Sequence, residues 1–137
     1  MPEVAVQGRP RPVGDAVVRR AVARVLAGER RAARMSVTFV GRDTMRRLNR
    51  DHLGHDRPTD VLSFALDTPG GLLGDVYVCP WVAAREARAR GLPARQEVIR
   101  LVVHGTLHVL GWDHPEGEAR TRSSMWRRQE RYVEQLT

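Results

Sequence analysis

A chain of 137 residues is long enough to bury one hydrophobic core, and we expect a single domain over residues 1–137. A single cysteine excludes an internal disulfide, and no apolar stretch reaches the length of a membrane span; the composition therefore predicts a cytoplasmic protein. The net charge of +7 comes from arginine alone and favours a phosphate-bearing partner, although a bias toward Arg, Ala and Gly weakens that inference.

The hydrophobic periodicity predicts helices and strands throughout the chain. In chain order, we expect a strand over 3–7, a helix over 13–28, a strand over 36–40, a helix over 43–50, a loop over 51–60, strands over 61–66 and 74–79, and helices over 80–90, 94–110 and 118–136. Gly28 and Gly91 are expected to end helices, Asp43 to cap one, and Pro80 to occupy a first turn.

The helix predicted over 94–110 is the expected centre of the domain. From Leu101 onward it is apolar nearly all round, which is typical of a helix buried on every side. Strands come mostly first and helices mostly last. This order predicts an α+β fold, in which a small mixed β-sheet packs with helices around one buried central helix.

Three of the five histidines lie within LVVHGTLHVLGWDH, at the end of that helix. His104 and His108 are four residues apart, so both project from one helix face and can hold one metal ion. Gly111 is expected to end the helix in a left-handed turn, which brings His114 back as a third ligand. Three imidazoles leave one position of a tetrahedral zinc for water, as in catalytic sites.

The spacing matches the metzincin signature H-E-x-x-H-x-x-G-x-x-H, with one difference. Gly105 replaces the glutamate that is the general base of those proteases, which argues against a peptidase. Zinc lowers the pKa of its water to about 7 in the best-known case, so hydrolysis needs no strong protein base. A glycine inside a helix also predicts the close approach of another backbone, such as a strand beside the metal.

The loop before the strand over 61–66 is the expected second half of the site. Arg57 is the candidate catalytic residue, because a guanidinium suits a phosphate beside the zinc; turn scaffolding is the alternative. Asp113 either orients a ligand imidazole or stabilises its own turn. His52 and His55 either contact substrate or are solvated. Glu97 is explained by its place near a helix N-terminus.

The stretches HGTLHVLGWDH, RPTDVLSF and LGDVYVCP closely resemble the YbeY family of bacterial endoribonucleases, from about Ser36 to Met125. The resemblance implies a zincin-like fold, with one zinc ion per chain on His104, His108 and His114. It implies a metal-dependent, single-strand-specific endoribonuclease that acts in maturation of the small-subunit ribosomal RNA 3′ end and in ribosome quality control. The implied partners are ribosomal RNA and the ribosome, with no membrane.

The chain departs from the family pattern at Leu53, where related sequences usually carry an arginine. A phosphate contact by that arginine therefore does not transfer, and Arg57 or Arg50 is the expected substitute. Two alternative functions stay open. One is a zinc-stabilised, ribosome-associated factor without strong catalysis, and the other is a metzincin-like peptidase.

Overall fold

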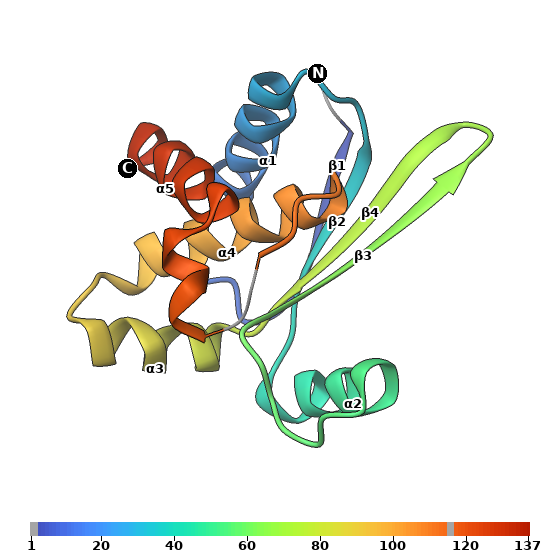
Figure 1. The fold of residues 1–137 in the computed structure, drawn as a ribbon. Coiled ribbons are helices and arrows are strands. Elements are labelled where there is room, and N and C mark those ends of the chain that lie inside the picture. Colours follow the sequence, from blue (N-terminus) through green and yellow to red (C-terminus); the bar gives the residue numbers. More distant parts are fainter. Residues whose placement is uncertain (1–2, 115–116) are drawn as a thin grey trace.

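The computed structural model describes residues 3–114 and 117–137, with the backbone alone at Glu118. It is an α+β arrangement, as predicted (Figure 1). Its elements are β1 (Val4–Gly8), α1 (Asp15–Glu29), β2 (Arg34–Phe39), α2 (Arg42–Leu53), β3 (Val61–Thr68), β4 (Gly71–Val78), α3 (Pro80–Arg90), α4 (Ala94–Val109), the 3-10 helix η1 (Gly117–Arg122) and α5 (Ser124–Leu136). No helix in the described ranges is long and apolar enough to cross a membrane.

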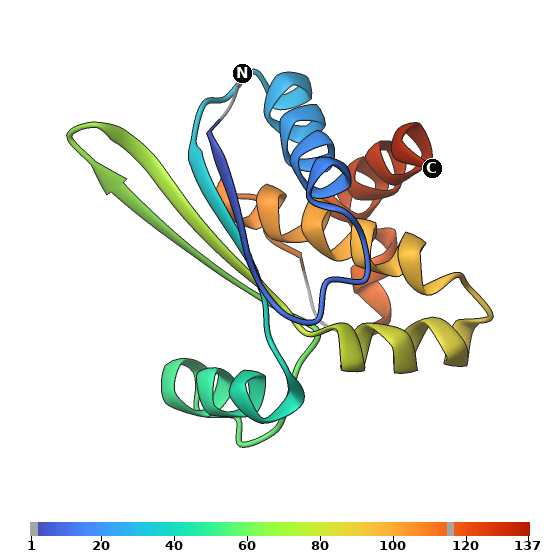
Figure 2. The same ribbon diagram turned by 180° about the vertical axis from the view of Figure 1, so that it is seen from behind.

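The four strands form one mixed sheet in the order β1-β2-β4-β3. β1, β2 and β4 are parallel, and β3 pairs antiparallel with β4 through a tight turn at residues 69–70. Side chains alternate between the two faces of a strand, so Met35, Val37 and Phe39 of β2 are buried on one face. Figures 1 and 2 show α1, α4 and α5 gathered on one side of the sheet, while the β3–β4 hairpin extends beyond the helices.

Helix α4 is the buried centre, as the sequence predicted. Every residue from Glu97 to Thr106 is buried, and α4 packs against β3, β4, α1, α3 and α5. The other face of the sheet is covered near the start of β3 by α2. There, a second apolar cluster brings Met45 of α2 together with Leu62 and Cys79. The domain thus places the C-terminal turns of α4 beside β3, the edge strand.

Several predicted element ends are wrong, each for a local reason. Helix α1 continues past Gly28 to Glu29, and Arg30 takes the left-handed conformation (φ 56°). Helix α2 begins after Gly41, so Asp43 lies in its first turn and does not cap it. The helix runs to Leu53 and ends at the left-handed Gly54. Gly91 and Pro80 behave as predicted.

The C-terminal helix predicted over 118–136 is divided in two. Residues Gly117–Arg122 form a 3-10 helix, and Ser123 then starts α5. The hydroxyl of Ser123 accepts a hydrogen bond from the backbone N–H of Trp126 at 3.1 Å, which is a helix cap of the usual kind. The cap lets the chain change direction, so that α5 packs against α4.

Candidate metal centre

His104, His108 and His114 meet at the end of α4, as the spacing predicted. Their ligand nitrogens all lie within 4.8 Å of one another, close enough to hold one ion. The ring centroids of His104 and His108 are 4.6 Å apart, and the His114 centroid is 5.0 and 5.1 Å from these two. Three imidazole nitrogens are a donor set that suits zinc and related transition metals.

The turn that returns His114 to the helix is held on both sides. Gly111 has φ 98°, a conformation that favours glycine, and its N–H donates to the His108 carbonyl at 3.0 Å. Trp112 then donates from its indole Nε1 to the Glu29 carboxylate at 2.8 Å, which ties the turn to α1. The Asp113 carboxylate accepts from the backbone N–H of His114 at 2.9 Å, the turn-stabilising contact that the sequence left as one of two alternatives.

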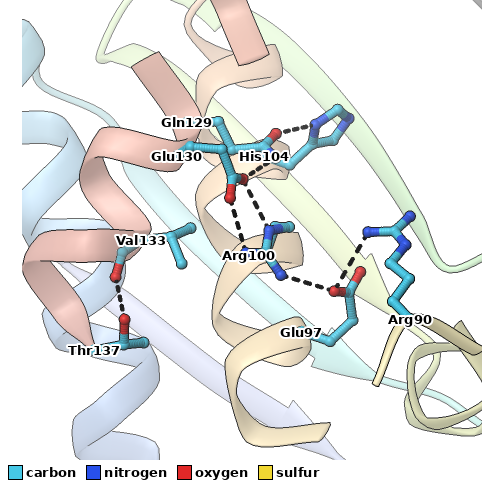
Figure 3. Close-up of polar contacts among 8 residues, drawn as sticks. All are labelled: Arg90, Glu97, Arg100, His104, Gln129, Glu130, Val133 and Thr137. Carbon is cyan, nitrogen blue, oxygen red and sulfur yellow. Dashed lines mark hydrogen bonds and ion pairs between the residues drawn. The ribbon is translucent and has the colours of Figure 1, made fainter. Parts of the chain in front are cut away.

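A chain of polar contacts fixes the orientation of His104 (Figure 3). Arg100 donates to both carboxylate oxygens of Glu130 at 2.8 Å, and Glu130 accepts from the Gln129 amide nitrogen at 3.0 Å. A carboxylate only accepts, so the amide nitrogen of Gln129 must face it and the amide oxygen must face His104. That oxygen lies 2.6 Å from Nδ1 of His104. The proton of the neutral ring therefore belongs on Nδ1, and Nε2 keeps its lone pair for a metal ion.

The carboxylates of Glu97 and Glu130 in this series of polar contacts also have partners. Glu97, which is 2% exposed, pairs with Arg100 at 2.9 Å and with Arg90 at 3.7 Å. The carboxylate is thus part of the support beneath His104, a role that its position near a helix N-terminus did not suggest. Burial alone would raise the pKa of Glu130, but hydrogen bonds from Arg100 and Gln129 outweigh it and lower that pKa.

Two of the histidines are kept neutral. Burial lowers the pKa of His104 to about 3, against a smaller opposing effect of the Gln129 hydrogen bond. Burial, followed by the neighbouring His114, also lowers the pKa of His108. Imidazole binds metal in its neutral form, so these two side chains meet little competition from protons near pH 7.

Gly105 marks the close approach of α4 to the sheet, although side chains and not backbone make the contact. A Cβ at Gly105 would lie 2.5 Å from Cγ1 of Val76 and 3.1 Å from Oγ of Ser63. The sequence predicted a strand at this place, and the strands are β4 and β3. Because Gly105 has no side chain, α4 packs closely against the sheet. The histidines therefore lie beside β3, the edge strand.

A pocket of about 440 Å³ lies in front of the three histidines. Besides these three histidines, it is lined by the end of α2, by the loop before β3, by β3 itself and by residues that follow α4: Asn49, Leu53, His55, Arg57, Thr59, Asp60, Val61, Leu62, Ser63, Phe64, Asp113 and Arg120. The Asn49 side-chain amide, which is buried, donates to the Arg57 carbonyl at 2.8 Å and so anchors the loop to α2.

Arg57 lines this pocket, whereas Arg50, the other expected substitute, does not. The Arg57 guanidinium makes no hydrogen bond or ion pair with any side chain that the structure describes, so none of these side chains holds it in place by a direct contact. Arg50 instead pairs with Asp51 at 3.1 Å. Of the loop histidines, His55 lines the pocket, and His52 packs against Phe64 with ring centroids 5.0 Å apart.

Sequence reasoning missed two residues of the site, Arg120 and Gln129. Arg120 lines the pocket, and its charge contributes to the lowered pKa of His104 and His108. Within the described residues, its buried Nε has no hydrogen-bond partner. Gln129 is buried on α5 together with Met125, Tyr132 and Val133. Its place as a polar residue at the helical spacing of these apolar residues was the signal that the sequence offered.

Comparison with known proteins agrees with the motif. The sequence model described as Endoribonuclease YbeY matches residues 12–137. The chain belongs to the YbeY family. Among YbeY-family relatives, Endoribonuclease YbeY of Alkalilimnicola ehrlichii is 44% identical over 112 residues, which are 76% of this chain and 68% of the relative. Endoribonuclease YbeY of Chlorobium luteolum is 36% identical over 127 residues, covering 92% of this chain and 91% of the relative.

The fold comparison agrees with the YbeY-family assignment. The solution structure of TM1509 from Thermotoga maritima matches with a TM-score of 0.67 and 29% identity, covering 97% of this chain and 88% of that one. The resemblance inferred from the histidine motif is therefore confirmed. Alignments with the first relatives cover between 54% and 70% of their own lengths, so parts of those proteins have no counterpart in the aligned region.

Proposed function

We propose that the protein is a zinc-dependent, single-strand-specific endoribonuclease, acting in the cytoplasm on the 3′ end of small-subunit ribosomal RNA and in ribosome quality control. The observation that carries the proposal is the convergence of His104, His108 and His114 at a pocket that is also lined by Arg57 and Arg120. Membership of the YbeY family supports RNA as the substrate. We also infer that residues 1–137 act as one domain.

Each part of the site has its own role in the proposed reaction. His104, His108 and His114 would hold the zinc ion, which would supply Lewis-acid activation of water and of a phosphoryl oxygen when bound. Arg57, from the loop before β3, and Arg120, from η1, line the same pocket as the histidines, and they bind the scissile phosphate and neutralise the charge that develops on it. Asp113 holds the turn that carries His114. Four consecutive residues of β3, Val61 to Phe64, line the pocket, and this stretch suits a single strand of RNA.

The two alternatives are weaker on physical grounds. A peptidase needs a proton donor for its leaving amine, and Gly105 provides no carboxylate at the position that supplies it in metzincins. A purely structural zinc usually has four protein ligands, whereas in the described part of the chain only three potential ligands, all histidines, converge here. If the protein binds metal but leaves RNA intact, it is a ribosome-associated factor without catalysis.

The test combines metal analysis with cleavage of a single-stranded RNA, with and without chelator. We expect about one zinc per chain, cleavage that stops with chelator, and loss of both in His108→Ala. Arg57→Ala should keep the metal and lose cleavage by roughly a hundredfold, as when a single charge-stabilising donor is removed. Leu53→Arg should cleave as well as the parent or better.

Arg50→Ala is the matched control, because Arg50 lies on α2 outside the pocket and should leave cleavage unchanged. Stoichiometric metal in His108→Ala would refute the ligand assignment. If Arg57→Ala cleaves like the parent, the phosphate contact lies elsewhere, and Arg120 is the next residue to replace. Bound zinc together with intact RNA would support the factor without catalysis.

A further inference from the structure

We propose that Trp81, Arg42 and Arg85 form a second binding site, which takes the sugar-phosphate backbone of single-stranded RNA next to the metal pocket. The proposal rests on the proposed function, because it names where the same RNA continues after it leaves the three histidines. None of these residues belongs to the metal pocket itself. They line a separate hollow of about 360 Å³ with Asp43, Arg46, Asp56, Arg57 and Pro58.

The sheet topology brings the three residues together. β2 and β4 are parallel neighbours, and Phe39 of β2 pairs with Val78 of β4 at their ends. Three residues beyond that pair stand Arg42, at the start of α2, and Trp81, at the start of α3. The loop before β3 reaches the same end of the sheet, because Val61 also pairs with Val78. Arg57 of that loop therefore lines both the metal pocket and this second hollow.

The geometry presents two guanidinium groups held on one aromatic ring. The Cζ atoms of Arg42 and Arg85 lie 5.0 and 4.9 Å from the Trp81 ring centroid, within cation–π distance. Trp81 is nonetheless 45% exposed, which is unusual for so large an apolar side chain. An arginine stacked on a ring keeps its N–H edges free for a phosphate, and its plane remains available to a base.

The charge of the hollow is only partly neutralised. Arg46 is matched by Asp56, with two hydrogen bonds at 2.8 and 3.1 Å. Arg42 has only a 3.6 Å contact with Asp43, and Arg85 makes no ion pair with the carboxylates that the structure describes. Arg42, Arg57 and Arg85 thus form a row of weakly paired cations that leads away from the histidines. A polyanion with flexible, unpaired bases suits such a row.

The experiment measures binding of a fluorescent 12-nucleotide single-stranded RNA by anisotropy at several salt concentrations. A gel at the end of each titration checks that the RNA is intact. Arg42→Gln/Arg85→Gln removes two phosphate contacts. At a slope of about 0.7 per contact on a single strand, the magnitude of the salt slope should fall by about 1.4, and the affinity at 0.1 M salt by about 25-fold.

Three further variants distinguish the effect of the position of the two arginines from the effect of their charge. Trp81→Ala keeps the charge of both arginines but removes the ring that holds them in place. The affinity for RNA should therefore fall by about threefold, with the salt slope nearly unchanged. Trp81→Phe, which keeps an aromatic ring, should restore most of the lost affinity. Arg20→Gln/Arg131→Gln removes the same charge from exposed positions on α1 and α5. This control should lose much less affinity than the Arg42/Arg85 pair.

Two results would overturn the proposal. One is an Arg42/Arg85 variant that binds RNA like the parent, and the other is a control pair that loses as much affinity. In either case, metal-dependent cleavage by the parent would leave the proposed function intact. Conversely, weaker binding by the Arg42/Arg85 variant, with no cleavage by the parent under any metal condition, would support the second site and refute the nuclease.

Discussion

Replacing Gln129 by leucine tests whether the metal centre depends on its support beneath His104. The substitution keeps a side chain of similar size in a position that is 1% exposed, but it removes the acceptor 2.6 Å from Nδ1. The Nδ1–H group is then buried without a partner. Glu130 loses one hydrogen bond and keeps its two contacts with Arg100, so the rest of the chain of contacts should stay in place.

Two magnitudes follow from that geometry. An unsatisfied buried N–H costs about 1–3 kcal/mol, which should appear as a lower free energy of unfolding of the metal-free protein. A ligand imidazole that loses its orienting partner typically costs about 10–100-fold in metal affinity. Gln129→Glu keeps an oxygen acceptor toward His104 and should retain metal affinity within about tenfold of the parent. Its second oxygen faces the Glu130 carboxylate in place of the amide donor, so this variant should also have a lower free energy of unfolding.

Zinc affinity is measured by competition with a fluorescent chelator, and stability by urea unfolding after chelator treatment. Gln135→Leu is the matched control, because it makes the same change at an exposed position on α5. We expect Gln129→Leu to bind zinc more weakly than both Gln129→Glu and the control. Parent-like zinc affinity in Gln129→Leu would refute the inference that the amide orients His104.

Two other predictions concern stability. The Cβ that Gly105→Ala adds would lie 2.5 Å from Cγ1 of Val76, and such overpacking costs about 1–3 kcal/mol. Alanine returns roughly 1 kcal/mol of helix propensity, so urea unfolding should show a net destabilisation of up to about 2 kcal/mol; a variant more stable than the parent would contradict the close packing of α4 on the sheet. The metal-free protein should lose stability as the pH falls from about 6.5 toward 3, because the unfolded chain takes up a proton that buried His104, with its pKa lowered to about 3, excludes. Urea unfolding at pH 7.5 and 5.5 measures this above the range where carboxylates titrate. His104→Phe should reduce the difference without abolishing it, because burial also lowers the pKa of His108; equal midpoints for the parent would refute the prediction.

Local sequence patterns were enough to predict the parts of the centre that lie close together in the chain. The four-residue spacing of His104 and His108 fixes their common face, since helix geometry is set by the backbone, and Gly111 permits the turn that returns His114. The apolar character of residues 101–110 likewise determined which helix is buried. Arg57 was predictable as a member of the pocket because it stands in the loop that precedes a recognisable strand.

The distant residues that support and extend that centre could not be predicted from local sequence, because the packing of the folded domain brings them together. Gln129 is 25 residues from His104 in the chain and meets it because α5 packs on α4, a contact that no local spacing encodes. Arg42 and Trp81 meet because β2 and β4 are parallel neighbours in one register. Strand pairing and helix packing are chosen by the burial of the whole core, so they place polar side chains that carry no pattern of their own.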